Sequence, residues 1–221
     1  MGIDVGGERK GFDLAVVDAD LTLVDSGAHL GIPDVIGLVK QWNPAVIAVD
    51  SPCEPAPPGD HLRECELQLN SAVCGIRWTP DISAIEASNY YAWIRNGFRL
   101  YAALEGVPGV ELIEVFPTAS WTRWAGKRVA RRARWTREAL AQLPVSGLPP
   151  RNNQDFRDSV AAAVTAWQYS RDQSESFGPI VVPVAGNPTA YRPLWMAPTG
   201  GRARSAPECR APSPPVRPPA L

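Results

Sequence analysis

The segment GIDVGGERKGFDLAVVD, residues 2–18, decides the fold. A short apolar run opens it and stops at Gly6–Gly7, and the apolar stretch Phe12–Val17 that follows has the character of a buried strand. Across the turn at residues 18–20, Leu21–Val24 has the composition of a hairpin partner. The chain is therefore expected to begin with three antiparallel strands.

Beyond this segment, helices and strands alternate. Pro33 opens a helix whose apolar stripe runs to Trp42, and Ala45–Val49 is apolar throughout, as in a strand covered on both faces. The remaining predicted elements are a helix from Asp60 to about Val73, a helix from about Asn89 to Leu104, a strand at Val110–Phe116, helical stretches near Ser120–Trp124 and Ala130–Leu143, and a helix from Gln154 to about Tyr169. This order predicts an α/β fold with a mixed five-stranded sheet, three strands antiparallel and then parallel strands, flanked by helices.

The chain length of 221 residues suits one domain with a substantial core, which we assign to residues 1–186. The segment 187–221 is rich in proline and arginine and is treated as a tail. From about residue 197 onward it has no hydrophobic periodicity, so it is expected to be mostly disordered.

Composition argues against several classes of protein. Four cysteines without a CxxC pair, beside only two histidines, argue against a structural zinc site and a disulfide framework, and favour reduced thiols in the cytoplasm. No apolar run approaches the roughly 18 residues that span a bilayer, so no membrane association is expected. The formal net charge of −1 gives no general attraction to nucleic acid, which must come from a local patch instead.

Four aspartates are placed where a metal-binding site would need them. Asp4 precedes the glycine pair, Asp50 follows an apolar strand at the edge where α/β sheets build ligand crevices, and Asp155 and Asp158 share one side of a helix. Each has a plainer interpretation alone, as a strand end, a turn cap or a helix N-terminal acid. Taken together, they predict a self-repelling cluster that protons or metal ions must neutralise.

Magnesium or manganese fits such a cluster best, because these ions prefer oxygen ligands. We expect Asp4, Asp50 and Asp158 to be the ligands, with two ions about 3.5–4 Å apart able to activate water and stabilise a leaving oxygen. Glu114 lies between Ile113 and Val115 in a predicted strand and is costly without a partner, so it is a candidate further metal or second-layer ligand. Lys10 is either a phosphate-binding group or a turn residue.

The segments GIDVGG, AVDSP and DFRDSVAAAVTAW resemble the ribonuclease H-like superfamily, which includes Holliday-junction resolvases. In those resolvases a first-strand Asp, an acid ending the fourth strand and two acids of a final helix bind the catalytic metals. The resemblance implies those catalytic roles here for Asp4, Asp50, Asp155 and Asp158.

More narrowly, residues 2–170 look like a prokaryotic family of unknown function that is described only as predicted nucleases with this fold. Further matching segments are RECE at residues 63–66, YAWIRNGFRLYAAL and IEVFPTASW. Asp50 departs from the Glu of typical resolvases by one methylene, and the Ser51–Pro52 turn also differs. The resemblance therefore supports the fold more than the activity.

A basic segment rich in tryptophan lies between Trp121 and Arg137. Cations neutralise phosphates and tryptophans stack on bases, which favours nucleic-acid binding here. The alternative is a solvated helical face whose arginines pair with surface acids while the tryptophans pack inward. The candidate binding residues are Trp124, Lys127, Arg128, Arg131 and Arg132.

Three functions remain open. The first is metal-dependent hydrolysis of nucleic-acid phosphodiesters, either DNA or RNA, through the two-metal carboxylate site. The second is a nucleotide-binding phosphotransferase, because sugar kinases and actin-like ATPases also begin with a strand like GIDVGG, although the second such domain and the glycine-rich adenosine motif are missing. The third is a catalytically inactive nucleic-acid-binding module of the same fold.

Overall fold

A computed structural model describes residues 1–186, and the predicted tail at 187–221 lies outside the described residues. These residues form a seven-stranded mixed sheet in the order β3-β2-β1-β4-β5-β7-β6, so the prediction of five strands was wrong. The strands are β1 (Gly2–Val5), β2 (Phe12–Val17), β3 (Leu23–Leu30), β4 (Val46–Asp50), β5 (Glu111–Val115), β6 (Ser174–Phe177) and β7 (Ile180–Pro183).

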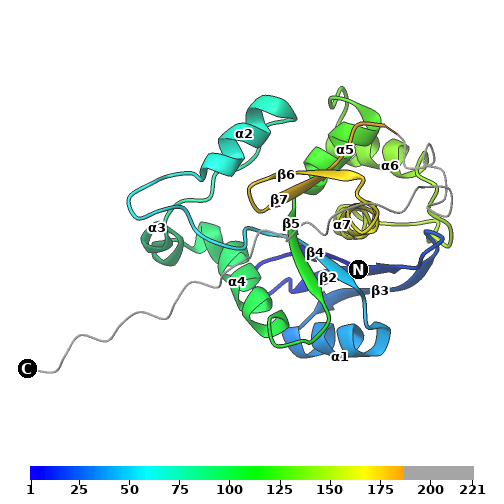
Figure 1. The fold of residues 1–221 in the computed structure, drawn as a ribbon, viewed down its shortest axis with the longest axis horizontal. Helices are drawn as coiled ribbons and strands as arrows, with labels where there is room; N and C mark the ends of the chain where they lie inside the picture. Colours follow the sequence, from blue (N-terminus) through cyan, green and yellow to red (C-terminus); the bar gives the residue numbers. More distant parts are fainter. Residues whose placement is uncertain (187–221) are drawn as a thin grey trace, which may run out of the picture.

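Helices cover both faces of the sheet (Figure 1). On one face, α1 and α4 pack against Ile3, Leu14 and Val49. On the other, α7 lies across the centre of the sheet, with α5 and α6 beside it. The helices are α1 (Ile32–Trp42), α2 (Glu64–Ala72), α3 (Ile82–Ala87), the 3₁₀ turn η1 (Asn89–Tyr91), α4 (Ala92–Leu104), α5 (Pro117–Ala125), α6 (Arg132–Leu140) and α7 (Gln154–Tyr169).

The first three strands are antiparallel, as predicted, and β4 and β5 then continue the sheet in parallel with β1. This confirms the predicted α/β architecture, in which three antiparallel strands are followed by parallel strands. The third strand is longer than expected and shifted, since it spans Leu23–Leu30 rather than Leu21–Val24. Leu21 has a positive φ of 57°, which belongs to the turn and not to a strand. The pairing of β3 with its neighbour β2 is interrupted by two register shifts.

The two unexpected strands, β6 and β7, form a hairpin that extends the sheet beyond β5. Each has four residues, which is shorter than the usual five or six. Gly178–Pro179 makes the turn and Pro183 ends β7, so the sequence resembles a loop with breakers. The short helix α3, whose first turn is capped by the Asp81 carboxylate, was also not predicted.

Helix α7 begins and ends at the residues the sequence predicted, and it is buried along most of its length. It lies directly on β1, because a Cβ atom on Gly2 would come within 2.1 Å of the Ala163 nitrogen and 2.3 Å of the Ser159 oxygen. Only glycine allows so close an approach of helix and strand. The backbone contact fixes where Asp158 lies relative to β1.

The two-residue period of the strands decides which acids face α7. Ile3 and Val49 pack on the α1–α4 face, so the alternate residues Asp4 and Asp50 point to the α7 face. In β5 the acid lies on the other face. Ile113 packs on the α7 side, so the next residue, Glu114, points to the opposite face of the sheet. The predicted acids are therefore divided between the two faces of the sheet.

Within residues 1–186, no helix is both long and apolar enough to cross a bilayer.

Candidate carboxylate site and its basic wall

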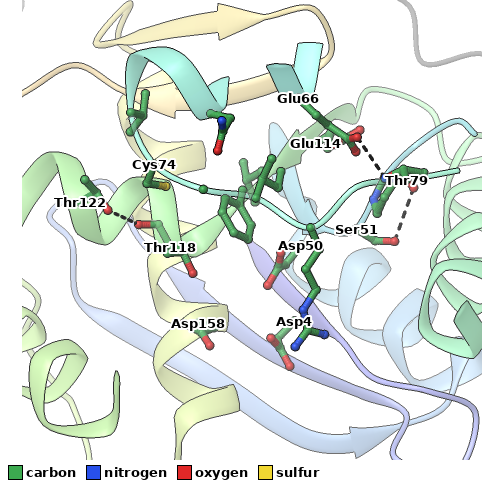
Figure 2. A pocket seen from close by; sticks show the side chains of 18 of the residues that line it. Asp4, Asp50, Ser51, Glu66, Cys74, Thr79, Glu114, Thr118, Thr122 and Asp158 are labelled. Carbon is green, nitrogen blue, oxygen red and sulfur yellow. Dashed lines mark hydrogen bonds between the residues drawn. The ribbon is translucent and has the colours of Figure 1, made fainter. Parts of the chain in front are cut away.

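A cleft of about 1020 Å³ opens at the carboxyl ends of β1, β4 and β5. Figure 2 shows Asp4 from β1, Asp50 from β4 and Asp158 from α7 around one space, with the chain from Cys74 to Thr79 crossing the same view. The cleft is lined by the acids Asp4, Asp50, Glu114, Asp155 and Asp158, and by the bases Arg63, Arg77, Lys127, Arg128 and Arg132. All four aspartates predicted from the sequence thus line one cavity.

Asp4 and Asp50 stand side by side, because their Cα atoms pair in the parallel β1–β4 ladder, where strands lie about 4.8 Å apart. Asp4 is only 8% exposed. Burial raises the pKa of Asp4 to about 7; Lys10 lowers it, while Asp158 and Asp155 raise it. Burial likewise raises the pKa of Asp50 well above its ordinary range, and repulsion from Asp4 and Asp158 adds to this shift. The pair therefore tends to keep a proton or to take up a cation.

Lys10 supplies a cation at one edge of this pair. Its Nζ lies 2.7 Å from Oδ1 of Asp155 and 3.4 Å from Oδ2 of Asp4. The turn after β1 folds Lys10 back over the site, with the Lys10 N–H donating to the Gly7 carbonyl at 2.9 Å. A Cβ atom on Gly6 would lie 2.6 Å from Cδ of Lys10, so the glycine makes room for this side chain. The GIDVGG motif thus serves to place a lysine beside Asp4.

Asp158 is held by three neighbouring side chains. Trp121 Nε1 donates to Oδ1 at 3.0 Å, Gln154 Nε2 reaches both oxygens at 3.0 Å, and Arg132 forms an ion pair with Oδ2 at 2.8 Å. The side chain is buried and strongly oriented by these contacts. A metal ion bound here would have to replace one of them.

The donor set suits a hard divalent cation at Asp4 and Asp50. No hydrogen-bond donor within residues 1–186 reaches the Asp50 carboxylate, and Lys10 is the one such partner of the Asp4 carboxylate there. Two neighbouring carboxylates with a single donor between them offer the oxygen ligands that Mg²⁺ or Mn²⁺ prefers. Within the same residues, no group of three or more histidine, cysteine, aspartate or glutamate side chains already has the geometry to hold an ion. The pair therefore fits the metal, while the third ligand would require Asp158 to be released from a neighbour.

Glu114 does not face this pair but belongs to a buried ion network on the other face of the sheet. Arg63 binds both Glu114 oxygens, at 2.8 and 2.6 Å, and it also pairs with Glu66 at 3.0 Å. Glu114 accepts the Cys53 N–H at 2.9 Å, which holds the chain three residues after Asp50. Although burial lowers the pKa of Arg63, the charge of Glu114 outweighs it and the pKa is raised. We therefore do not carry Glu114 forward as a metal ligand.

The basic candidates divide into two groups. Lys127, Arg128 and Arg132 line the cleft, whereas Arg131 is exposed without lining it. Trp124 packs edge-on against Trp121 with ring centroids 5.4 Å apart, and its Nε1 donates to Gln168. Its ring is thus used in core packing, as the plainer interpretation of the segment had it, and we remove Trp124 from the candidate stacking residues.

Several residues that line the cleft, Arg77 among them, were not named as site residues from the sequence. Arg63 and Glu66 lie in the RECE segment, where an Arg three residues before a Glu at a helix start was the available signal. Trp135 of α6 lines the cleft, but nothing in the local sequence separates it from a core tryptophan. The contacts that define their roles span up to 51 positions along the chain, which local patterns do not report.

Comparison with known proteins places the chain in a family. The family described as "Protein of unknown function (DUF429)" matches residues 2–179. The chain belongs to this family. Asp4, Asp50, Asp155 and Asp158, and with them Lys10, all lie inside the part that matches DUF429.

Among solved structures, the DUF429 chain is similar to RuvC from Thermus thermophilus, at 15% identity and a TM-score of 0.43. The similarity covers 77% of this chain and 95% of that one. No curated protein matches the chain.

Proposed function

We propose that the protein is a metal-dependent nuclease that hydrolyses phosphodiester bonds of DNA or RNA at the carboxylate site. The observation that carries the proposal is the Asp4–Asp50 pair, side by side with raised pKa values in a cleft that basic side chains also line. An acidic floor that attracts cations, next to bases that attract phosphates, is suited to phosphodiester chemistry. A cytoplasmic location stays a prediction from the cysteine usage.

Each residue has a part in this proposal. Asp4 and Asp50 would hold the divalent ion, and Asp158, oriented by Trp121 and Gln154, would complete its ligands after exchanging a neighbour. Asp155 would stay close through Lys10. Mg²⁺ or Mn²⁺, as one ion or as two, would polarise the scissile phosphodiester and acidify a water molecule. In this view the protein residues bind, orient and neutralise.

Lys10 and Arg132 have a second part, because each already neutralises a site carboxylate. When a divalent ion takes over that charge, the ammonium of Lys10 becomes available to a substrate phosphate. Arg132 lies between Asp158 and the rest of the basic segment, and it can turn its free nitrogens toward the same phosphate.

The first experiment is cleavage of a labelled panel of single- and double-stranded DNA and RNA, with Mg²⁺, with Mn²⁺ and with EDTA. We expect Asp4→Asn and Asp50→Asn to lower the cleavage rate by at least about 100-fold while circular dichroism stays that of the wild type. Glu86→Gln is the matched control, because it removes an exposed carboxylate that does not line the cleft.

The result that would overturn the proposal is equally definite. If the well-folded wild type cleaves nothing with either metal, or if EDTA and the two aspartate variants leave its cleavage rate unchanged, the carboxylate site is not a nuclease centre. A rate that falls equally in Glu86→Gln would mean that the loss is not specific to the carboxylate site.

A further inference from the structure

The side of the cleft formed by the α5–α6 loop and α6 has binding capacity that the protein itself leaves unused. We call it the basic wall and define it by Lys127, Arg128, Arg132 and Trp135, all of which line the cleft. Lys127 and Arg128 are exposed, and within residues 1–186 neither has an ion-pair partner. Arginines elsewhere on the domain, such as Arg134 and Arg99, do have carboxylate partners.

Trp135 adds an independent sign of a missing ligand. The residue is 5% exposed, and its indole Nε1 is buried without a hydrogen-bond partner among the described residues. A buried donor left unpaired costs free energy, and an indole N–H can only donate. A partner for this N–H must be an acceptor, and Trp135 lines the same cleft as the unpaired cations Lys127 and Arg128.

Arg132 connects the basic wall with the carboxylate site. Its Nη2 binds Asp158 at 2.8 Å, and Lys127 and Arg128 lie shortly before it in the chain. An anion on the basic wall therefore lies next to the carboxylate site and not in it.

We propose that the basic wall is a second phosphate subsite, which binds a phosphate adjacent to the scissile one and so selects a polynucleotide strand. The inference rests on the proposed function of the carboxylate site. Lys127 and Arg128 would neutralise the phosphate, and the Trp135 N–H would donate to one of its oxygens. A nucleoside monophosphate has no second phosphate to place there, so it binds weakly.

The shape of the wall favours a chain over a nucleoside triphosphate. Lys127 and Arg128 stand on a loop whose next residue, Val129, is 94% exposed, so the cations meet a ligand that extends into solvent. The cleft volume, about 1020 Å³, lies at the upper end of the roughly 300–1,000 Å³ typical of small-molecule pockets. The chain also has no GxxxxGK[ST] loop to wrap a triphosphate.

The test measures binding without metal, so it is separate from cleavage. Labelled 12-nucleotide single-stranded DNA and RNA are titrated in EDTA at several salt concentrations, with fluorescence anisotropy as the readout. Lys127→Met/Arg128→Met should weaken binding at least about tenfold and reduce the slope of log affinity against log salt by about 0.7, since the two residues neutralise one phosphate and each phosphate contact contributes about 0.7 for single strands. Trp135→Phe should weaken binding about fivefold without changing the slope, because it removes a neutral donor.

Matched controls remove the same groups elsewhere. Lys40→Met/Arg134→Met removes two exposed charges outside the cleft, and Trp42→Phe removes an indole whose N–H already donates to Asp25. The proposal is overturned if the wall variants match these controls, if the wild type binds neither oligonucleotide, or if a nucleoside triphosphate displaces the strand at equal concentration. Binding that persists in a protein that never cleaves would refute the nuclease and leave the subsite standing.

Discussion

Two pairs of acids lie at the same end of the sheet, on opposite faces, and the protein neutralises them differently. Glu66 and Glu114 share the guanidinium of Arg63, and backbone N–H groups of Cys53, Arg63 and Thr79 complete their hydrogen bonds. Asp4 and Asp50 have no such arrangement among residues 1–186: Lys10 touches Asp4 at 3.4 Å, and no donor there reaches the Asp50 carboxylate.

The difference separates a cluster that the fold already neutralises from the cluster that we propose to be functional. A carboxylate whose charge is met by fixed donors contributes to stability only while those donors stay in place. A carboxylate pair without them is unfavourable to the fold and is retained where a ligand completes it. Both clusters are acidic and largely removed from solvent. Their hydrogen-bond and ion-pair partners, and not the acids themselves, therefore distinguish the two clusters.

The largest effect is expected from removing the cation of the structural cluster. Arg63→Met leaves two buried carboxylates facing each other, so the free energy of unfolding should fall by about 3–5 kcal/mol. Urea denaturation followed by circular dichroism measures it. Arg134→Met, which breaks an exposed pair with Glu138, should change stability very little. Equal stability of the two variants would show that the Arg63 network does not hold the fold.

An effect of intermediate size, with opposite signs at the two clusters, is expected from neutralising one acid of each. At pH 8, Glu114→Gln should lower the free energy of unfolding by about 2–3 kcal/mol, because Arg63 keeps only part of its partner charge. Asp50→Asn should raise it by about 1 kcal/mol, since the half-buried side chain no longer repels Asp4. Chemical denaturation of both variants in EDTA measures these changes. A loss of stability in both variants would contradict the difference between the two clusters.

The last effect is a dependence of stability on pH. In the folded protein the Asp4 carboxyl keeps its proton up to a pKa of about 7, whereas the ordinary value is 3.8. Between these values the folded state binds more protons, so stability falls as pH rises, by at most about 1.4 kcal/mol per pH unit for each proton. Asp4→Asn should flatten this slope in denaturation curves recorded from pH 5 to 8.

Adding a divalent metal ion to the same denaturation measurement tests whether the ion binds at Asp4. Since protons and Mg²⁺ compete for the Asp4 carboxylate, 10 mM Mg²⁺ should stabilise the wild type more at pH 8 than at pH 5.5. A stabilisation that is equal at both pH values, or that persists unchanged in Asp4→Asn, would mean that the ion binds elsewhere.

Features that depend on local periodicity were predictable. The apolar stripe and the flanking Asn153 cap define α7 within a few residues, and the glycine pair marks the turn after β1. Asp4, Asp50, Asp155 and Asp158 follow from positions at strand ends and on one helix side. The cleft that they share could be anticipated, because carboxyl ends of parallel strands meet at one sheet edge.

Features that depend on long-range pairing were not predictable. The strands β6 and β7 are stabilised by their pairing with each other and with β5, while their own sequence of four residues each resembles a turn region. Glu114 was recognised as needing a partner, yet that partner, Arg63, lies 51 positions away. Trp124 and Trp135 belong to one basic segment, and only packing shows which of them lines the cleft.

The close seat of α7 on Gly2 has a consequence for how the site tolerates change. Because backbone meets backbone there, the helix can neither sink toward the strand nor be pushed along it by a larger side chain. The backbone separation of Asp4 and Asp158 is therefore fixed, and it suits side chains of the length of aspartate. A side chain longer by one methylene, as in Asp4→Glu, would leave the backbone unchanged and displace the carboxylate oxygens from their positions in the site. A chemically conservative exchange would therefore disturb the geometry of the site.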